Sequence, residues 1–164
     1  MAIQLTETKD LTRQEKYELA ITQVRHLVND ESNLIANLAN VSSLLKNTFE
    51  DYLWVGFYIA AADNPEELVL GPFQGRPACT RIKFGKGVCG TSASLKQTII
   101  VDDVDQFPGH IVCDSLSKSE IVVPIVSNGN VRAVLDVDSD KLSNFTDTDR
   151  HYLEEIVKNL APLF

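Results

Sequence analysis

Three cysteines, Cys79, Cys89 and Cys113, lie within one 35-residue window of a chain whose only other sulfur belongs to Met1. Each lies in or beside a stretch rich in turn residues, in the strings GPFQGRPAC, GKGVCGT and FPGHIVCD. Thiols placed in this way are more often reagents than packing groups, because the thiolate is a nucleophile and a metal ligand. The window therefore predicts free reactive thiols, redox catalysis or a metal site.

A group of carboxylates follows the last thiol. Glu120 precedes the apolar run 121–126, and Asp136 and Asp138 end the run 131–137. The two runs flank an Asn-Gly pair, which favours a tight hairpin, so antiparallel pairing would bring the three carboxylates to one end of a sheet. Like charges gathered there would raise the pKa of at least one carboxyl and keep a proton available near neutral pH. The alternative is a solvated strand rim.

Two other motifs match a ligand-binding pattern only in part. The glycines of residues 85–90 satisfy G-x-G-x-x-G, but no complete βαβ unit surrounds them, as a dinucleotide site requires. Residues 136–147 begin like a calcium loop, yet Lys141 takes the sixth position and Asp147 the twelfth, where glycine and glutamate are needed. The sequence therefore predicts neither a dinucleotide site nor a calcium site.

Zinc is the metal that these thiols could bind. Cys79, Cys89, His110 and Cys113 could supply four ligands, but structural zinc sites bring their ligands as close pairs, and here only the last two are close. His110 is better explained as a turn residue whose polar atoms bond the backbone. We therefore expect no metal and no other cofactor.

Size and charge narrow the class of protein. The 164 residues suit one domain, 1–164, with a core large enough to fold without disulfides. A net charge of −8 without Lys/Arg clusters disfavours nucleic acid and anionic lipid as partners. The N-terminal sequence has no basic region followed by an apolar stretch, and no apolar run is long enough for a membrane span. We expect a cytoplasmic protein.

The elements that position these groups follow from hydrophobic periodicity. Capping signals at Thr12 and Glu15, and at Thr146 and Asp149, open the first and last helical patterns. We expect helices at 11–29, 34–49, 88–97 and 146–160, and strands at 52–60, 67–73, 79–84, 98–101, 121–126 and 131–137. This order predicts an α+β fold, a central antiparallel sheet of about six strands with helices packed mainly on one side.

A resemblance to a known family adds to this picture. The strings WVGFY, LGPFQGRPAC, GKGVCGT, VDDVDQFPGHIVCD, SEIVVPI and VLDVDS, in this order and spacing, resemble the free methionine-(R)-sulfoxide reductases, which are single GAF-domain enzymes. The similarity runs from about Glu31 to the C-terminus, so residues 1–30 lie outside it and are expected to supply the first helix. One departure is Ala133, where the family more commonly has glycine. This change should affect packing more than chemistry.

The resemblance implies a role for each thiol. Cys113 matches the cysteine that attacks the sulfoxide sulfur and becomes a sulfenic acid. Cys79 matches the thiol that condenses with this sulfenic acid to form a disulfide. Cys89 matches a third cysteine, which is either an alternative resolving thiol or an auxiliary group.

It also implies a substrate pocket. Glu120, Asp136 and Asp138 match acidic residues that bind the substrate ammonium and help to protonate the departing oxygen. Trp54 matches an aromatic wall that can select one sulfoxide epimer, and Tyr58 shares its strand face; simple core packing of both rings is the alternative. Because such a site pairs both charges of an amino acid, peptide-bonded methionine sulfoxide should be a poor substrate.

The partners that the resemblance implies are free methionine (R)-sulfoxide and a thioredoxin-type dithiol that reduces the disulfide. A homodimer is one assembly state that remains open. The rival hypothesis is a non-catalytic GAF module that binds a small ligand or senses oxidation through its cysteines. Stoichiometry discriminates the two, because a sensor binds methionine sulfoxide without consuming it.

Overall fold

The computed structural model describes residues 8–164; residues 1–7, the start of the segment expected to supply the first helix, lie outside the described part. The elements are, in chain order, α1 (Arg13–Asp30), α2 (Leu34–Thr48), β1 (Trp54–Ala60), β2 (Glu67–Gln74), β3 (Arg81–Lys83), α3 (Gly87–Leu95), β4 (Ile99–Val101), η1 (Val104–Gln106), β5 (Ser119–Ser127), β6 (Asn130–Ser139), α4 (Asp147–Leu160) and η2 (Ala161–Leu163). None of the helices within 8–164 is long and apolar enough to cross a membrane.

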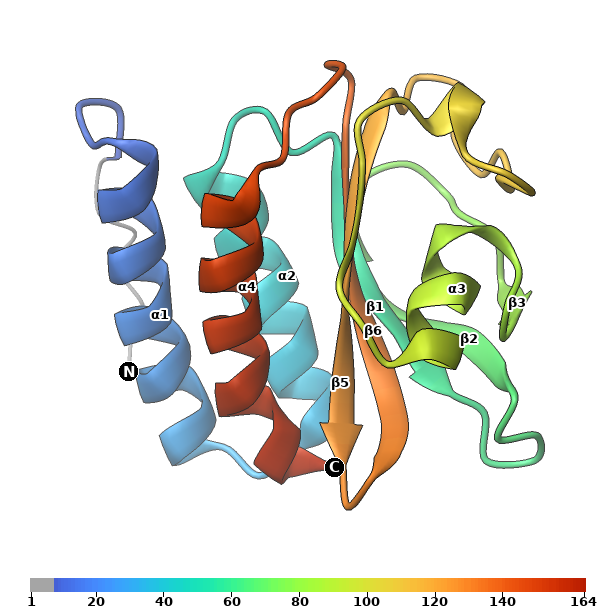
Figure 1. The fold of residues 1–164 in the computed structure, drawn as a ribbon. Helices are drawn as coiled ribbons and strands as arrows, with labels where there is room; N and C mark the ends of the chain where they lie inside the picture. Colours follow the sequence, from blue (N-terminus) through green and yellow to red (C-terminus); the bar gives the residue numbers. More distant parts are fainter. Residues whose placement is uncertain (1–7) are drawn as a thin grey trace.

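One sheet organises the molecule. Its six strands run in the order β3-β2-β1-β6-β5-β4, and every neighbouring pair is antiparallel. Helices α1, α2 and α4 lie on one side of the sheet, and α3 lies on the other (Figure 1). The predicted α+β fold, with an antiparallel sheet and helices mainly on one side, is confirmed.

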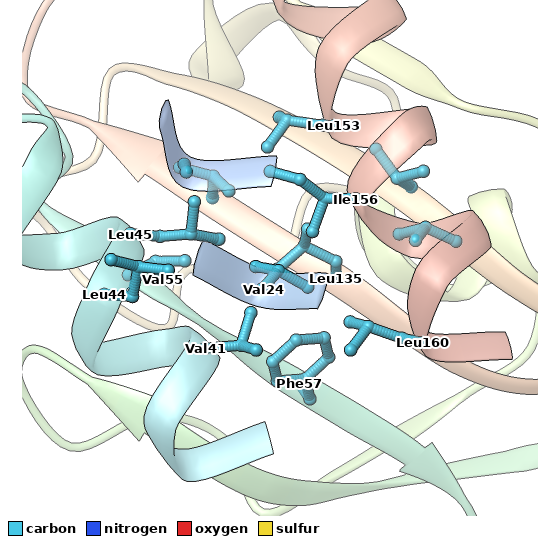
Figure 2. Close-up of a cluster of buried hydrophobic side chains, with 14 of the residues drawn as sticks. Val24, Val41, Leu44, Leu45, Val55, Phe57, Leu135, Leu153, Ile156 and Leu160 are labelled. Atoms are coloured by element: carbon cyan, nitrogen blue, oxygen red, sulfur yellow. The ribbon is translucent and has the colours of Figure 1, made fainter. Parts of the chain in front are cut away.

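The larger core lies between the sheet and the three helices. Figure 2 shows Val24 of α1, Leu45 of α2 and Ile156 of α4 converging on Phe57 of β1 and Leu135 of β6. These helices present an apolar stripe at a spacing of three or four residues, which is the pattern of a helix that covers a sheet. This core stabilises the sheet, and the opposite face of the same sheet carries α3 and the smaller core.

Both predicted capping boxes are present. The Thr12 hydroxyl accepts from the amide of Glu15 at 3.3 Å, and the Glu15 carboxylate accepts from the amide of Thr12 at 2.8 Å. Thr146 and Asp149 form the equivalent box at the start of α4. Each box satisfies backbone N–H groups that the first turn of a helix leaves without a partner.

The structure departs from the prediction around two of the thiols. Strand β3 begins at Arg81, so Cys79 lies in the connection before it and not in the strand. Helix α3 begins at Gly87 and buries Cys89 in the smaller core. The helix predicted at 88–97 is confirmed as α3, but the expectation that Cys89 lies outside the core is wrong, because α3 packs on the sheet and buries this thiol.

Candidate active site

The β5–β6 hairpin brings the three carboxylates together. Glu120 lies directly opposite Asp138 across the strand pair, and Asp136 lies opposite Val122 on the same face of the sheet. Glu120 and Asp136 are buried, and Asp138 is half-buried. The predicted convergence is confirmed, and the alternative of a solvated strand rim is wrong for Glu120 and Asp136.

Burial and mutual repulsion change the protonation of this cluster. Burial raises the pKa of Glu120 well above its usual value, and the charges of Asp136 and Asp138 raise it further. The pKa of Asp136 is also raised well above normal by burial and by the charge of Asp138. Burial raises the pKa of Asp138 to about 6, against the effect of the Ser117 hydroxyl, which bonds and stabilises the charged form. The cluster therefore retains protons near neutral pH.

The thiols divide into a pair and a single group. Cys79 and Cys113 form a disulfide with their Cα atoms 5.5 Å apart. Cys89 is a buried free thiol whose Sγ donates to Oε1 of Glu120 at 4.0 Å. Burial and then the charges of Asp136 and Glu120 raise the pKa of Cys89 well above normal, which keeps it a thiol and a poor nucleophile at neutral pH.

A pocket of about 530 Å³, its open mouth included, joins Cys113 to Cys89 and the three carboxylates. Trp54 and Tyr58 form one wall from the same face of β1. The Trp54 Nε1–H donates to the Arg76 carbonyl at 3.0 Å, and the Tyr58 hydroxyl donates to the Cys79 carbonyl at 3.0 Å. The other lining residues are Pro77, Ala78, Ile82, Gly87, Val88, His110, Ile111, Asp114 and Ser117. The two rings are thus both buried packing groups and pocket walls.

His110 lies in a turn, as the sequence predicts, but the hydrogen bond observed there comes from its backbone and not, as expected, from its side chain. Its backbone N–H donates to the Phe107 carbonyl at 3.1 Å, while its half-buried side chain lines the pocket. Burial lowers the pKa of His110, so the imidazole is neutral at physiological pH. The disulfide takes Cys79 and Cys113 out of the four-ligand zinc set in this state.

Two residues shape the site although sequence reasoning did not single them out as part of it. The Ser117 hydroxyl donates to Oδ1 of Asp138. Oδ1 of Asp114 accepts from the Leu116 amide at 2.9 Å and from the Arg76 guanidinium at 3.2 Å, which ties the segment carrying Cys113 to the segment before Cys79. Residues 102–118 show no hydrophobic period, so no signal could have located these contacts.

Comparison with known proteins places the chain in a family. Residues 36–163 match the GAF domain family. The chain is 54% identical over 149 residues to GAF domain-containing protein A of Dictyostelium discoideum, covering 91% of this chain and 92% of the relative. It is 44% identical over 156 residues to a free methionine-R-sulfoxide reductase of Saccharomyces cerevisiae, covering 92% and 87%. The chain belongs to the free methionine-(R)-sulfoxide reductase family of GAF domains.

Members of this reductase family also share the complete fold. The X-ray structure of a free methionine-R-sulfoxide reductase from Neisseria meningitidis, in complex with its substrate, matches with a TM-score of 0.93 and 44% identity over 99% of this chain and 96% of that chain. The resemblance predicted from the six sequence strings is therefore confirmed at the level of family and fold.

Proposed function

We propose that residues 1–164, as one GAF-like domain, reduce free L-methionine (R)-sulfoxide to L-methionine. The observation that carries this proposal is the disulfide between Cys79 and Cys113 at the edge of a pocket lined by Glu120, Asp136 and Asp138. A dithiol that can form a disulfide supplies the two electrons of the reduction, and carboxyls with raised pKa supply the proton. Two similar proteins, from Saccharomyces cerevisiae and Neisseria meningitidis, are named free methionine-R-sulfoxide reductases, which supports the same conclusion.

The reaction begins at Cys113. Its thiolate attacks the sulfoxide sulfur to form a sulfur–sulfur bond, and a protonated carboxyl of Glu120 or Asp136 gives its proton to the oxygen. The resulting hydroxyl then moves from the methionine sulfur to the Cys113 sulfur as the sulfur–sulfur bond and the original sulfur–oxygen bond break. Methionine leaves with the electron pair on its sulfur, and Cys113 is left as a sulfenic acid. The Cys79 thiolate then attacks the sulfenic sulfur, hydroxide leaves and takes up a proton as water, and the disulfide seen in the structure forms.

The carboxylates also select the substrate. Asp138, with a pKa of about 6, is the member most readily ionised at neutral pH, and it suits the substrate ammonium. Trp54 offers an apolar surface for the S-methyl group, which distinguishes one sulfoxide epimer from the other. A peptide amide in place of the ammonium would leave the buried acidic group without a cation, so protein-bound methionine sulfoxide is a poor substrate.

A thioredoxin-type dithiol completes the cycle. Its thiolate attacks the disulfide, a mixed disulfide forms, and its second thiol releases Cys79 and Cys113 as thiols while the reductant becomes oxidised. Val112 and Leu116 flank this region as exposed apolar side chains, which suits contact with a protein partner. The cytoplasm supplies such dithiols and fits the proposed cycle.

One assay tests the proposal. The protein is incubated with an excess of mixed methionine sulfoxide diastereomers and a dithiol, and each epimer is followed by chiral chromatography. We expect many equivalents of the R epimer to be consumed while the S epimer remains, and Cys113→Ser to abolish the loss. Binding without consumption would instead identify a sensor, and full activity of Cys113→Ser would refute the assignment of the nucleophile.

A further inference from the structure

Three side chains with metal-ligating atoms meet in the lining of the pocket. Cys89 comes from α3, Glu120 from β5 and Asp136 from β6, and one ligand atom of each lies within 4.8 Å of the others. All three are buried. The backbone elements that carry them are packed against one another, so the arrangement is set by the fold and not by flexible surface chains.

A second observation points to a ligand at this place. Asp136 is only 6% exposed, yet its Oδ1 has no hydrogen-bond partner among the described residues. A buried carboxylate oxygen without a partner costs about 1–3 kcal/mol or more, so such atoms commonly mark a bound ion or ligand. Because Asp136 lines the pocket, a small cation can reach this oxygen through the pocket mouth.

We propose that Cys89, Glu120 and Asp136 form a binding site for one zinc ion or a similar thiolate-binding divalent metal. Zinc lies about 2.3 Å from sulfur and about 2.0–2.2 Å from carboxylate oxygen, so in tetrahedral geometry two ligand atoms of one ion are about 3.3–3.7 Å apart. Cys89 Sγ and Glu120 Oε1, 4.0 Å apart, are already close to this spacing, and the limit of 4.8 Å for the whole set requires a contraction of up to about 1.4 Å on binding. The thiolate disfavours calcium and magnesium, which prefer oxygen ligands.

Binding has a defined proton balance. The metal takes the place of the thiol proton of Cys89 and of any proton on the two carboxyls, and these protons are released to solvent. Because all three groups bind a metal in their deprotonated forms, metal affinity should increase with pH. The binding site does not rest on the proposed reductase function. Its consequence does: the ion would occupy the acidic end of the substrate pocket and inhibit the reaction competitively.

Cobalt(II) is a suitable probe because its bond to a thiolate gives a charge-transfer absorption. The titration uses the disulfide form, in which Cys79 and Cys113 are bonded to each other and Cys89 is the free cysteine. A charge-transfer band in this form can arise only from Cys89. We expect the band to saturate at one cobalt per chain, to grow with pH and to disappear when zinc is added.

Three variants decide the outcome. We expect Cys89→Ser to lose the band, and both Cys89→Ser and Asp136→Asn to bind zinc at least about tenfold more weakly in calorimetry. Asp147→Asn removes an exposed carboxylate from α4 and should leave binding unchanged.

If the wild type shows no band, or if Asp136→Asn binds zinc as tightly as the wild type, the proposal is wrong. Unfolding midpoints show whether each variant is folded. If Cys89→Ser does not fold, zinc binding by Asp136→Asn decides whether the proposed site exists. Because none of these readouts uses turnover, failure here is separate from failure of the reductase proposal.

Discussion

Cys79 and Cys89 are both candidates to resolve a sulfenic acid on Cys113, but they lie in different environments. Cys79 is bonded to Cys113 and is half-buried in a connection between strands. Cys89 is buried on α3 against Glu120, with a raised pKa that disfavours its thiolate. The structure therefore favours Cys79 as the resolving thiol.

We expect Cys79→Ser to release about one methionine per chain and then to stall, because its sulfenic acid has no efficient thiol partner. Cys89→Ser should continue through repeated turnovers, although more slowly. Rapid-quench measurement of methionine per chain, with a protein dithiol present, separates these results. A stall in Cys89→Ser together with repeated turnover in Cys79→Ser would reverse the assignment.

The raised pKa of Asp138 makes the free energy of unfolding depend on pH. Its pKa rises from the model-compound value of 3.8 to about 6 in the folded protein, so the folded state binds more protons than the unfolded state between these values. Stability contributed by the protonated form is therefore present at low pH and is lost as pH rises through about 6. A shift of this size corresponds to about 3 kcal/mol.

We expect Asp138→Asn to remove this dependence. Relative to the wild type, the variant should gain about 2 kcal/mol in free energy of unfolding between pH 4 and pH 7, because part of the full effect has already developed at pH 4, and it should lose activity. Urea unfolding of both proteins at several pH values measures the difference. A difference that stays constant with pH would show that Asp138 has a normal pKa in the folded state.

At the scale of elements, the β5–β6 hairpin shows what the sequence can predict. Two apolar runs around an Asn-Gly turn predict the hairpin and bring Glu120 to the end of the sheet that carries Asp136 and Asp138. The exact partner could not be predicted, because the pairing shifts by one residue between Ile125 and Val126, and only this shift places Glu120 opposite Asp138 instead of Val137. The helix at 88–97 could be predicted, but the burial of Cys89 could not, because the short glycine-rich string GKGVCGT does not show which face of α3 packs on the sheet. The hydrogen bond between Ser117 and Asp138 could not be predicted either, because Ser117 lies in a segment without regular secondary structure.

Gly56 of β1 leaves the space that the Trp54 ring of the pocket wall occupies. A Cβ atom on Gly56 would lie 2.3 Å from Cβ of Phe73 and 2.7 Å from the Trp54 ring. We expect Gly56→Ala to displace Trp54, to lower the free energy of unfolding by about 1–3 kcal/mol and to raise KM more than it lowers kcat. Chemical unfolding and steady-state kinetics measure the two effects.

Ala133→Gly is the matched control in the same sheet. Ala133 belongs to the core under the helices, on the face away from the pocket. Its replacement by glycine, the commoner family residue, should cost about 0.5–1 kcal/mol and leave KM unchanged. If Gly56→Ala lowers stability but also leaves KM unchanged, Trp54 does not form part of the substrate site.

In the whole molecule, the larger apolar core and the candidate active site lie on opposite faces of one sheet. Helices α1, α2 and α4 cover one face of the sheet and α3 lies on the other (Figure 1). The face under the three helices carries the larger apolar core, and the face with α3 carries the smaller core, Trp54 and the pocket. The α+β architecture could be predicted because each helix and strand shows its own period. The pairing of Cys79 with Cys113 was implied by the family resemblance and is present in the structure, but hydrophobic periodicity could not predict it, because the two connections that carry these residues meet only in the folded chain.

The outer surface beside the disulfide is where a protein reductant would dock in the proposed cycle. Val112 is 67% exposed and directly precedes Cys113, and Leu116 is exposed a few residues further on. An exposed apolar group beside a reactive disulfide suits the apolar surface of a dithiol protein. We expect Val112→Asp to slow recycling by thioredoxin about tenfold, because the new carboxylate would be desolvated on docking. Recycling by dithiothreitol should remain unchanged, since a small dithiol needs no docking surface.

Ile35→Asp provides the control for charge. Ile35 is 54% exposed near the start of α2, on the helix-covered side of the molecule, and its replacement changes the net charge by the same amount. Thioredoxin-dependent rates for this variant should match the wild type. Equal slowing of Val112→Asp with both reductants would mean that the substitution disturbs Cys113 itself, whereas equal slowing of both variants with thioredoxin would point to overall charge. Only a loss confined to Val112→Asp and to the protein reductant supports docking at this surface.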